Sequence, residues 1–281
     1  MFLSFFLSGN LFCRADNLSA GKRIWRLAWP LWVWALIYFL ADGMNSWSAL
    51  LWQMTTGHSA ELNPAMWYQS VLICMTVLLF VIGKYTNTQI RNVILIGLAA
   101  ASLLIQYLGY NFAWFKDLPY ELKYPVGRFV EMIPYASLGV LTAQFPERIK
   151  VRKHRITAII LCGGMAVCFA VLKAVIADPP GFQYAGAPSV GAAVVVVLFV
   201  YALPMEKLPP VFKKGVMVAS RYTLGIYCMH NLIGKFLTIL ISKTGINVNG
   251  FILCVIIYIA CYGISWCIAK IPNRHIRMLV C

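Results

Sequence analysis

Charged residues are scarce in this chain, and acidic residues are the scarcest among them. Only 12% of the 281 residues are charged, and 9 Asp and Glu stand against 24 Lys and Arg. In soluble domains about a quarter of the residues are charged and about half are apolar. This chain is 61% hydrophobic and has a mean hydropathy of +0.75. The composition excludes an ordinary soluble domain and predicts a membrane protein, whose length is better counted in spans.

The cysteines lack the spacing of a metal site or of a disulfide framework. None of the nine cysteines forms a CxxC pair, and most of them lie inside apolar runs. The sequence also contains no internal repeat and no low-complexity segment. Because zinc sites and disulfide scaffolds need characteristic cysteine spacings, we expect buried thiols and no metal centre.

Long apolar runs recur along the chain and are separated by short polar connections. A helix of about 20 mostly apolar residues crosses the hydrocarbon core of a bilayer. The runs predict eight complete spans, at residues 27–40, 67–83, 92–108, 125–143, 156–176, 189–203, 220–242 and 251–269. The fold class that follows is all-α, a polytopic bundle of membrane helices that forms a single domain over residues 1–281.

The net charge of +15 suggests nucleic acid as a partner, but the distribution of the basic residues argues against it. These residues lie in short connections between apolar runs. With the connector at residues 14–26 placed inside the cell, 18 of the 24 Lys and Arg fall on the inner side of the membrane and six on the other. The positive-inside rule therefore predicts a cytoplasmic C-terminus.

The chain begins with an apolar run, residues 1–12, that is too short to cross a bilayer. No basic segment precedes it, and no small-residue cleavage site follows an adequate apolar core. A secretory signal peptide is therefore not expected. We interpret the run as a partial span, the end of a helix whose beginning is missing.

The span at residues 220–242 contains three ionisable side chains of Arg, His and Lys. It carries Arg221 at one end, His230 near its middle and Lys235 beyond. Such groups are costly at bilayer depth and usually face a protein interior or a wet cavity. Tyr227 lies three residues before His230 and so shares its helical face. Two interpretations stay open: a packed histidine that donates to a neighbouring carbonyl, or a residue that transfers protons near neutral pH.

Two further pairs of charged residues are spaced three positions apart, which places each pair on one helical face. Arg23 and Arg26 suit phosphate oxygens, such as those of coenzyme A, or else anchor the helix on the cytoplasmic side. Arg128 and Glu131 lie in the span at 125–143, either as a self-neutralising ion pair or as partners of sugar hydroxyls. Spacing alone leaves both choices open.

Several short motifs resemble those of the acyltransferase-3 family of membrane proteins. The signature near the C-terminus of that family is similar to Ser220, Thr223-Leu224-Gly225-Ile226-Tyr227 and His230. Its R-x-x-R motif, which is followed by a proline, is similar to Arg23, Arg26 and Pro30, and weaker matches lie at Phe5-Phe6-Leu7-Ser8-Gly9 and Ile133-Pro134-Tyr135. The resemblance covers essentially the whole chain and implies a single domain of about ten helices.

The resemblance implies an enzyme that transfers an acyl group, often acetyl, from acyl-CoA to a hydroxyl of a cell-surface or lipid-linked glycan. The assignment that follows makes His230 and Tyr227 catalytic. Arg23 and Arg26 hold the donor phosphates, while Arg128 and Glu131 face the acceptor. No bound cofactor is expected, because acyl-CoA is a co-substrate. The partners are this donor, the glycan and membrane lipid, with no nucleic acid, and the expected location is the inner (plasma) membrane.

The chain departs from the family pattern at its N-terminus. The first-helix R-x-(ten)-H motif, which supplies the histidine thought to act as base, has no match in this sequence. We therefore expect a chain that lacks the first helix and most of the second, and His230 belongs to a different motif. Two alternatives remain: an inactive truncated remnant, and a carrier or flippase for a polar or lipid-linked glycan.

Overall fold

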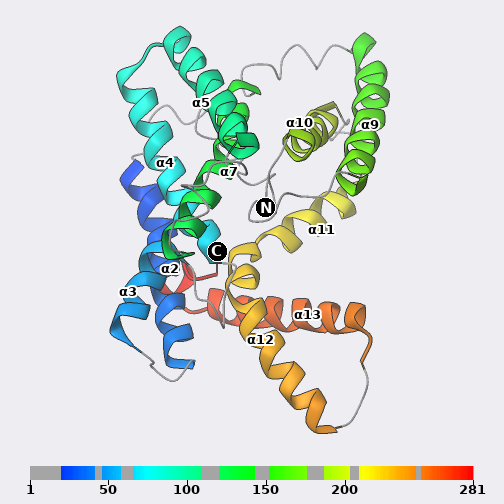
Figure 1. Cartoon of the computed structure of the whole chain (residues 1–281). Helices are drawn as coiled ribbons and strands as arrows, with labels where there is room; N and C mark the ends of the chain where they lie inside the picture. Colours follow the sequence, from blue (N-terminus) through cyan, green and yellow to red (C-terminus); the bar gives the residue numbers. More distant parts are fainter. Residues whose placement is uncertain are drawn as a thin grey trace. The chain divides into compact units, whose positions relative to one another are not determined.

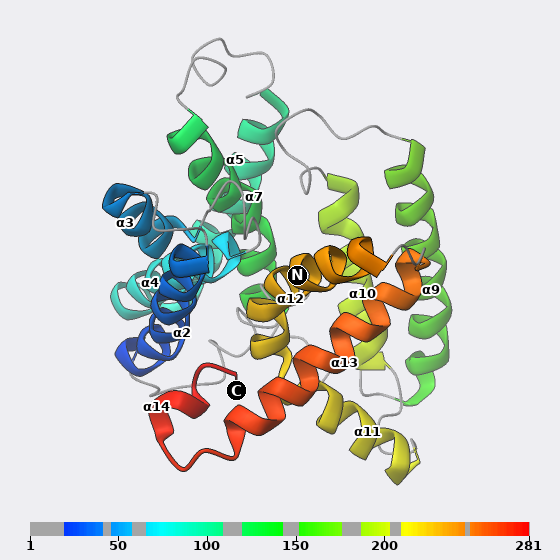
Figure 2. The ribbon, with the colours of Figure 1, turned by 90° about the horizontal axis from the view of Figure 1, so that it is seen from below.

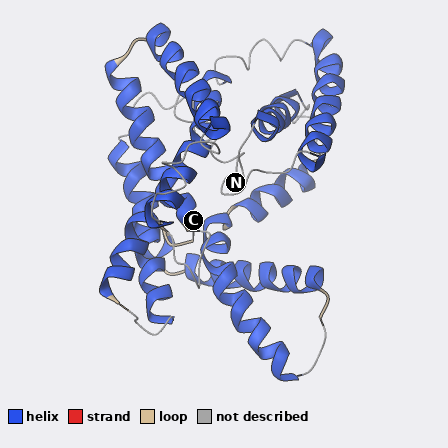
Figure 3. Ribbon diagram, viewed as in Figure 1, coloured by secondary structure: helices blue, strands red, loops and turns tan. Residues whose placement is uncertain are grey.

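A computed structural model describes residues 20–41, 46–57, 66–108, 120–142, 152–175, 187–202, 209–244 and 248–280. Every regular element within these ranges is an α-helix, and none of them contains a strand (Figure 3). The prediction of an all-α fold is confirmed for this part of the chain. The partial span predicted at residues 1–12 lies outside the described residues.

The chain divides into two compact units, and each unit is built from two separate stretches of sequence. One unit comprises Met1–Arg23 and Val71–Lys207, and the other comprises Ile24–Ser70 and Leu208–Cys281. We refer to them as the middle unit and the terminal unit. Each is therefore held together by contacts between residues that are distant in sequence.

The middle unit contains most of α4 (Trp67–Tyr85), with α5 (Thr88–Leu108), α7 (Tyr120–Thr142), α9 (Arg152–Val175) and α10 (Ala187–Ala202) (Figure 1). Helix α5 packs against α7, and α10 packs against α9. Gly191 permits the second of these contacts, because a Cβ atom there would lie 2.5 Å from Cζ of the Phe169 ring. A larger residue at Gly191 would force the phenyl ring to move.

The terminal unit contains most of α2 (Ala20–Ala41), with α3 (Trp47–Thr56), α11 (Pro210–Ser220), α12 (Thr223–Thr244), α13 (Gly250–Ala269) and α14 (Arg274–Arg277). Helix α12 packs against α13, which follows it in sequence (Figures 1 and 2). Helices α12 and α13 carry the groove described below.

The segment after α13 binds back onto α2 and α12 within the terminal unit. The indole Nε1–H of Trp34 donates to the carbonyl of Leu279 at 3.2 Å, and that of Trp29 donates to the carbonyl of His275 at 2.9 Å. Gly225 on α12 donates its amide to the carbonyl of Val280 at 3.4 Å. A Cβ atom at Gly225 would clash with Ser265 Oγ and lie 2.9 Å from Val280, so only glycine fits there.

The predicted spans all coincide with helices, although the number of full-length spans is not confirmed. Five helices of the described part are long and apolar enough to cross a membrane: Gly21–Ala41, Trp67–Tyr85, Thr88–Leu108, Thr223–Thr244 and Gly250–Ala269. The spans predicted at 125–143, 156–176 and 189–203 correspond to α7, α9 and α10. Helix α7 carries Arg128 and Glu131, and the apolar parts of the other two, Ile159–Leu172 and Pro188–Val200, are shorter.

Two helices occur where the sequence predicts only connections. Helix α3 lies in the connection at 42–66, where Ser46 Oγ accepts from the amide of Ala49 and Gly57 ends the helix at a φ of 68°. A side-chain acceptor at the start and a left-handed glycine at the end are standard helix caps. Helix α11 lies between the spans predicted at 189–203 and 220–242 and begins with Pro210, a residue favoured in the first turn.

Candidate active site

His230 and Tyr227 lie together on α12, as their spacing predicts. Their ring centroids are 5.9 Å apart, and both side chains are half-buried. The imidazole Nδ1 lies 2.7 Å from the backbone carbonyl oxygen of Tyr227. A carbonyl can only accept, so Nδ1 carries the proton of this hydrogen bond. In the neutral ring, Nε2 is then the atom with the basic lone pair.

A groove between α12 and α13 exposes this imidazole. Its volume is about 700 Å³, and His230, Asn231 and Lys235 supply polar or charged groups to its lining. Apolar side chains, among them those of Ile226, Ile239 and Ile257, form much of the rest. Small-molecule sites are typically concave, mostly apolar and provided with a few polar groups, which is the character of this groove.

The turn of α12 that holds His230 is fixed by residues of α2 and α4, all within the terminal unit. The hydroxyl of Tyr38 donates to the carbonyl of Cys228 at 2.7 Å and accepts from the amide of Leu232 at 3.3 Å. Gln69 Nε2 lies 3.4 Å from Cys228 Sγ, and the ring of Tyr68 meets that of Tyr227 at 5.5 Å. No pattern in the sequence predicts these contacts.

Arg23 and Arg26 occupy the first two turns of α2, which begins inside the connector predicted at residues 14–26. Arg26 is exposed and Arg23 is half-buried. Beside them, the indole of Trp25 stacks on that of Trp29 with centroids 5.7 Å apart. Two guanidinium groups at this spacing point to one side of the helix, an arrangement that can hold phosphate oxygens in a bidentate manner.

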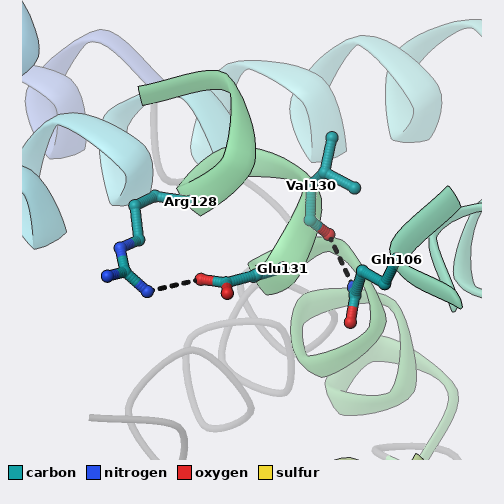
Figure 4. Close-up of polar contacts among 4 residues, drawn as sticks. All are labelled: Gln106, Arg128, Val130 and Glu131. Atoms are coloured by element: carbon teal, nitrogen blue, oxygen red, sulfur yellow. Dashed lines mark hydrogen bonds and ion pairs between the residues drawn. The ribbon is translucent and has the colours of Figure 1, made fainter. Parts of the chain in front are cut away.

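Arg128 and Glu131 form a buried ion pair on α7, within the middle unit. Arg128 Nη1 lies 2.8 Å from Glu131 Oε2, and the two side chains are 7% and 0% exposed (Figure 4). The Tyr124 ring lies 4.9 Å from the guanidinium carbon of Arg128. The pair is therefore desolvated, and the two opposite charges compensate each other.

A proline explains two further polar contacts beside this pair. Pro134 lies inside α7 and has no amide hydrogen to donate to the carbonyl of Val130, four residues earlier. Ser102 Oγ of α5 donates to that carbonyl instead, at 2.5 Å. Gln106 Nε2 of the same helix also donates to it, at 3.4 Å (Figure 4). Sequence reasoning missed both residues, although their spacing of four within an apolar run was a usable signal.

Among the described residues, no group of three or more His, Cys, Asp or Glu side chains could hold a metal ion. The six candidate site residues lie in the α12 turn, at the start of α2 and in the α7 ion pair.

The repeated apolar helices define a multi-pass membrane protein. A family model described as an acyltransferase domain matches residues 3–270, so the chain belongs to the acyltransferase-3 family of membrane acyltransferases. The match runs through both compact units and includes all six predicted site residues. No curated protein and no solved structure gives a significant match to the chain.

Proposed function

We propose that this membrane acyltransferase moves an acyl group, in the simplest case acetyl, from acyl-CoA to a hydroxyl of a cell-surface or lipid-linked glycan. The observation that carries the proposal is the state of His230. Its Nδ1–H is bonded to the carbonyl of Tyr227, and its side chain lines a groove large enough for a substrate group. A neutral imidazole held in this tautomer offers Nε2 as a base.

In the proposed reaction, Nε2 of His230 takes the proton of the acceptor hydroxyl. The oxygen then attacks the thioester carbonyl carbon, so that a C–O bond forms while the C–S bond breaks. Coenzyme A leaves as a thiolate and receives the proton, which gives an ester, a free thiol and a neutral imidazole. Tyr227 contributes through its carbonyl, which fixes the tautomer, and through its ring beside the imidazole.

Arg23 and Arg26 are proposed to bind the phosphates of the donor. The support is their position in the first two turns of α2, with Arg26 exposed, in a segment that the positive-inside rule assigns to the cytoplasm. Charge-assisted hydrogen bonds from guanidinium to phosphate are among the strongest polar contacts in proteins. The same rule supports an inner-membrane protein with a cytoplasmic C-terminus.

Arg128 and Glu131 are proposed to serve the acceptor. Both are charged, and the aromatic ring of Tyr124 lies beside them. Sugar hydroxyls bind well to charged groups that combine donors and acceptors. The ion pair between Arg128 and Glu131 could also be there only to stabilise the fold. The effects of these residues on stability and on acceptor binding must therefore be measured separately.

The experiment is transfer of radiolabelled acetyl from acetyl-CoA to glycan, in membranes that contain this chain. His230→Gln keeps a polar side chain but cannot act as a base, so the rate should fall about 10²- to 10⁴-fold. His275→Gln, at an exposed position on α14, is the matched control and should retain the rate.

Each outcome has a definite meaning. Full transfer by His230→Gln would place the base at another residue of the chain. No transfer by the unaltered chain, at normal membrane levels, would favour the inactive remnant or the glycan carrier.

A further inference from the structure

We propose that Tyr38 is a positioning residue for His230: its hydroxyl clamps the turn of α12 that carries the imidazole. The inference deepens the proposed function and rests on the role given there to His230. It concerns a residue of α2 that lies 192 positions away in the sequence and belongs to none of the motifs described above.

The clamp consists of two hydrogen bonds to one hydroxyl group. Tyr38 donates to the carbonyl of Cys228 and accepts from the amide of Leu232, at 2.7 and 3.3 Å. In a regular α-helix, the amide of residue 232 pairs with the carbonyl of residue 228. The hydroxyl therefore contacts both groups of one helical hydrogen-bond pair, and His230 lies midway between them.

Burial makes these contacts significant. Tyr38 is 1% exposed and Cys228 is 0% exposed, so water does not compete for the carbonyl. A hydrogen bond that excludes water strengthens in the low local dielectric, and the loss of either partner leaves a buried polar group.

Contacts from α4 restrain the same turn from a second helix. The side chain of Gln69, which is fully buried, donates to Cys228 Sγ, and Tyr68 packs edge-on against Tyr227. The His230 side chain donates a hydrogen bond to the carbonyl of Tyr227, and Tyr38 donates one to the carbonyl of Cys228. The two accepting carbonyls therefore belong to consecutive residues. An orientation change in one peptide plane would shift its neighbour, and with it the imidazole tautomer.

Tyr38→Phe tests the clamp, since it removes the hydroxyl and keeps the ring that fills the core. Tyr262→Phe on α13 is the matched control, because that half-buried tyrosine packs against Tyr222 and does not line the groove. The first readout is the ¹⁵N spectrum of histidine-labelled protein in nanodiscs, with the His230 signals identified by their loss in His230→Gln. The second is amide hydrogen exchange of the segment at 228–234.

In Tyr38→Phe we expect a smaller fraction of the Nδ1–H tautomer at His230. Exchange of the turn should be about 5- to 160-fold faster, the range expected for loss of two buried hydrogen bonds. The kcat of acetyl transfer should fall while KM for acetyl-CoA stays constant. Tyr262→Phe should change none of these quantities.

An unchanged His230 spectrum together with unchanged exchange in Tyr38→Phe would overturn the clamp, whatever happens to transfer. A changed spectrum that is specific to Tyr38→Phe supports it. Failure of the proposed function appears elsewhere, as full transfer by His230→Gln. The two ideas therefore fail by different measurements.

Discussion

Helices α7 and α12 both carry ionisable side chains within apolar sequence, and they accommodate them in opposite ways. In α7, Arg128 and Glu131 neutralise each other at 2.8 Å and are almost fully buried. In α12, His230 bonds a carbonyl of its own helix and stays half-buried in the lining of a groove. One helix keeps its charges inside the fold, whereas the other presents an imidazole to an open groove.

This contrast separates stability from chemistry. A desolvated ion pair is strongly coupled to folding, because removal of one partner strands the other charge in a medium that cannot solvate it. Substitution of a half-buried histidine leaves no opposite charge buried without its partner, so it should cost much less stability. Substitutions in α7 should therefore be seen first in unfolding, and those at His230 or at the exposed start of α2 first in binding or turnover.

The largest effect is expected at the start of α2. Arg23→Ala combined with Arg26→Ala removes two charge-assisted phosphate contacts, and should weaken acetyl-CoA binding by about 3–6 kcal/mol at about 1.5–3 kcal/mol each. Isothermal titration of the purified protein with acetyl-CoA measures this. Lys22→Ala, at an exposed neighbour in the same turn, is the control and should bind nearly normally. Unchanged affinity in the double variant would leave the pair as a membrane anchor.

The ion pair of α7 provides the next largest effect, on stability. Glu131→Gln removes the carboxylate that pairs with the buried Arg128 charge, which should cost about 3–5 kcal/mol. Reversible unfolding in mixed SDS and detergent micelles measures the loss. His230→Gln in the same assay should lie close to the unaltered protein. Equal destabilisation by the two variants would remove the distinction between the helices.

A double variant separates the structural role of the pair from its proposed role at the acceptor. Replacement of a buried ion pair by apolar side chains is often neutral or stabilising, so Arg128→Leu with Glu131→Leu should recover most of the stability. If the pair also binds the acceptor, this stable protein should still transfer acetyl poorly. A stable and fully active double variant would make the pair purely structural.

The positions of the long apolar helices could be predicted from the sequence because apolar length is a local property. All eight predicted spans coincide with helices. The i,i+3 spacing places Arg128 and Glu131 on one helical face, and the structure shows them as an ion pair. Helices α3 and α11 were missed, since each lies in a polar or basic connection and shows itself mainly by its terminal residues, Ser46 and Gly57 in one and Pro210 in the other. Such caps are signals that hydropathy does not weigh.

The supports of the site could not be predicted in the same way. Tyr38 and Cys228 lie 190 residues apart, and a tyrosine in an apolar run is ordinary. Their contact depends on how α2 packs against α12, which no local pattern encodes. Pro134 is the exception, since the carbonyl it leaves without an amide partner implies a donor from a neighbouring helix.

The smallest effect we predict concerns that donor. Ser102→Ala with Gln106→Leu removes both side chains that donate to the Val130 carbonyl, which should cost about 1–3 kcal/mol of stability. Adding Pro134→Ala to this variant supplies a backbone amide four residues along α7, so that the helix can satisfy the carbonyl itself. The triple variant should therefore regain stability that the double variant lost, measured by the same micelle unfolding. A triple variant no more stable than the double would show that the α5 side chains act through packing and not through this carbonyl. Recovery would instead confirm that side chains of α5 supply α7 with the hydrogen bond that Pro134 removes. The segment of α7 that carries the ion pair would then depend on α5, as the His230 turn of α12 depends on Tyr38 of α2.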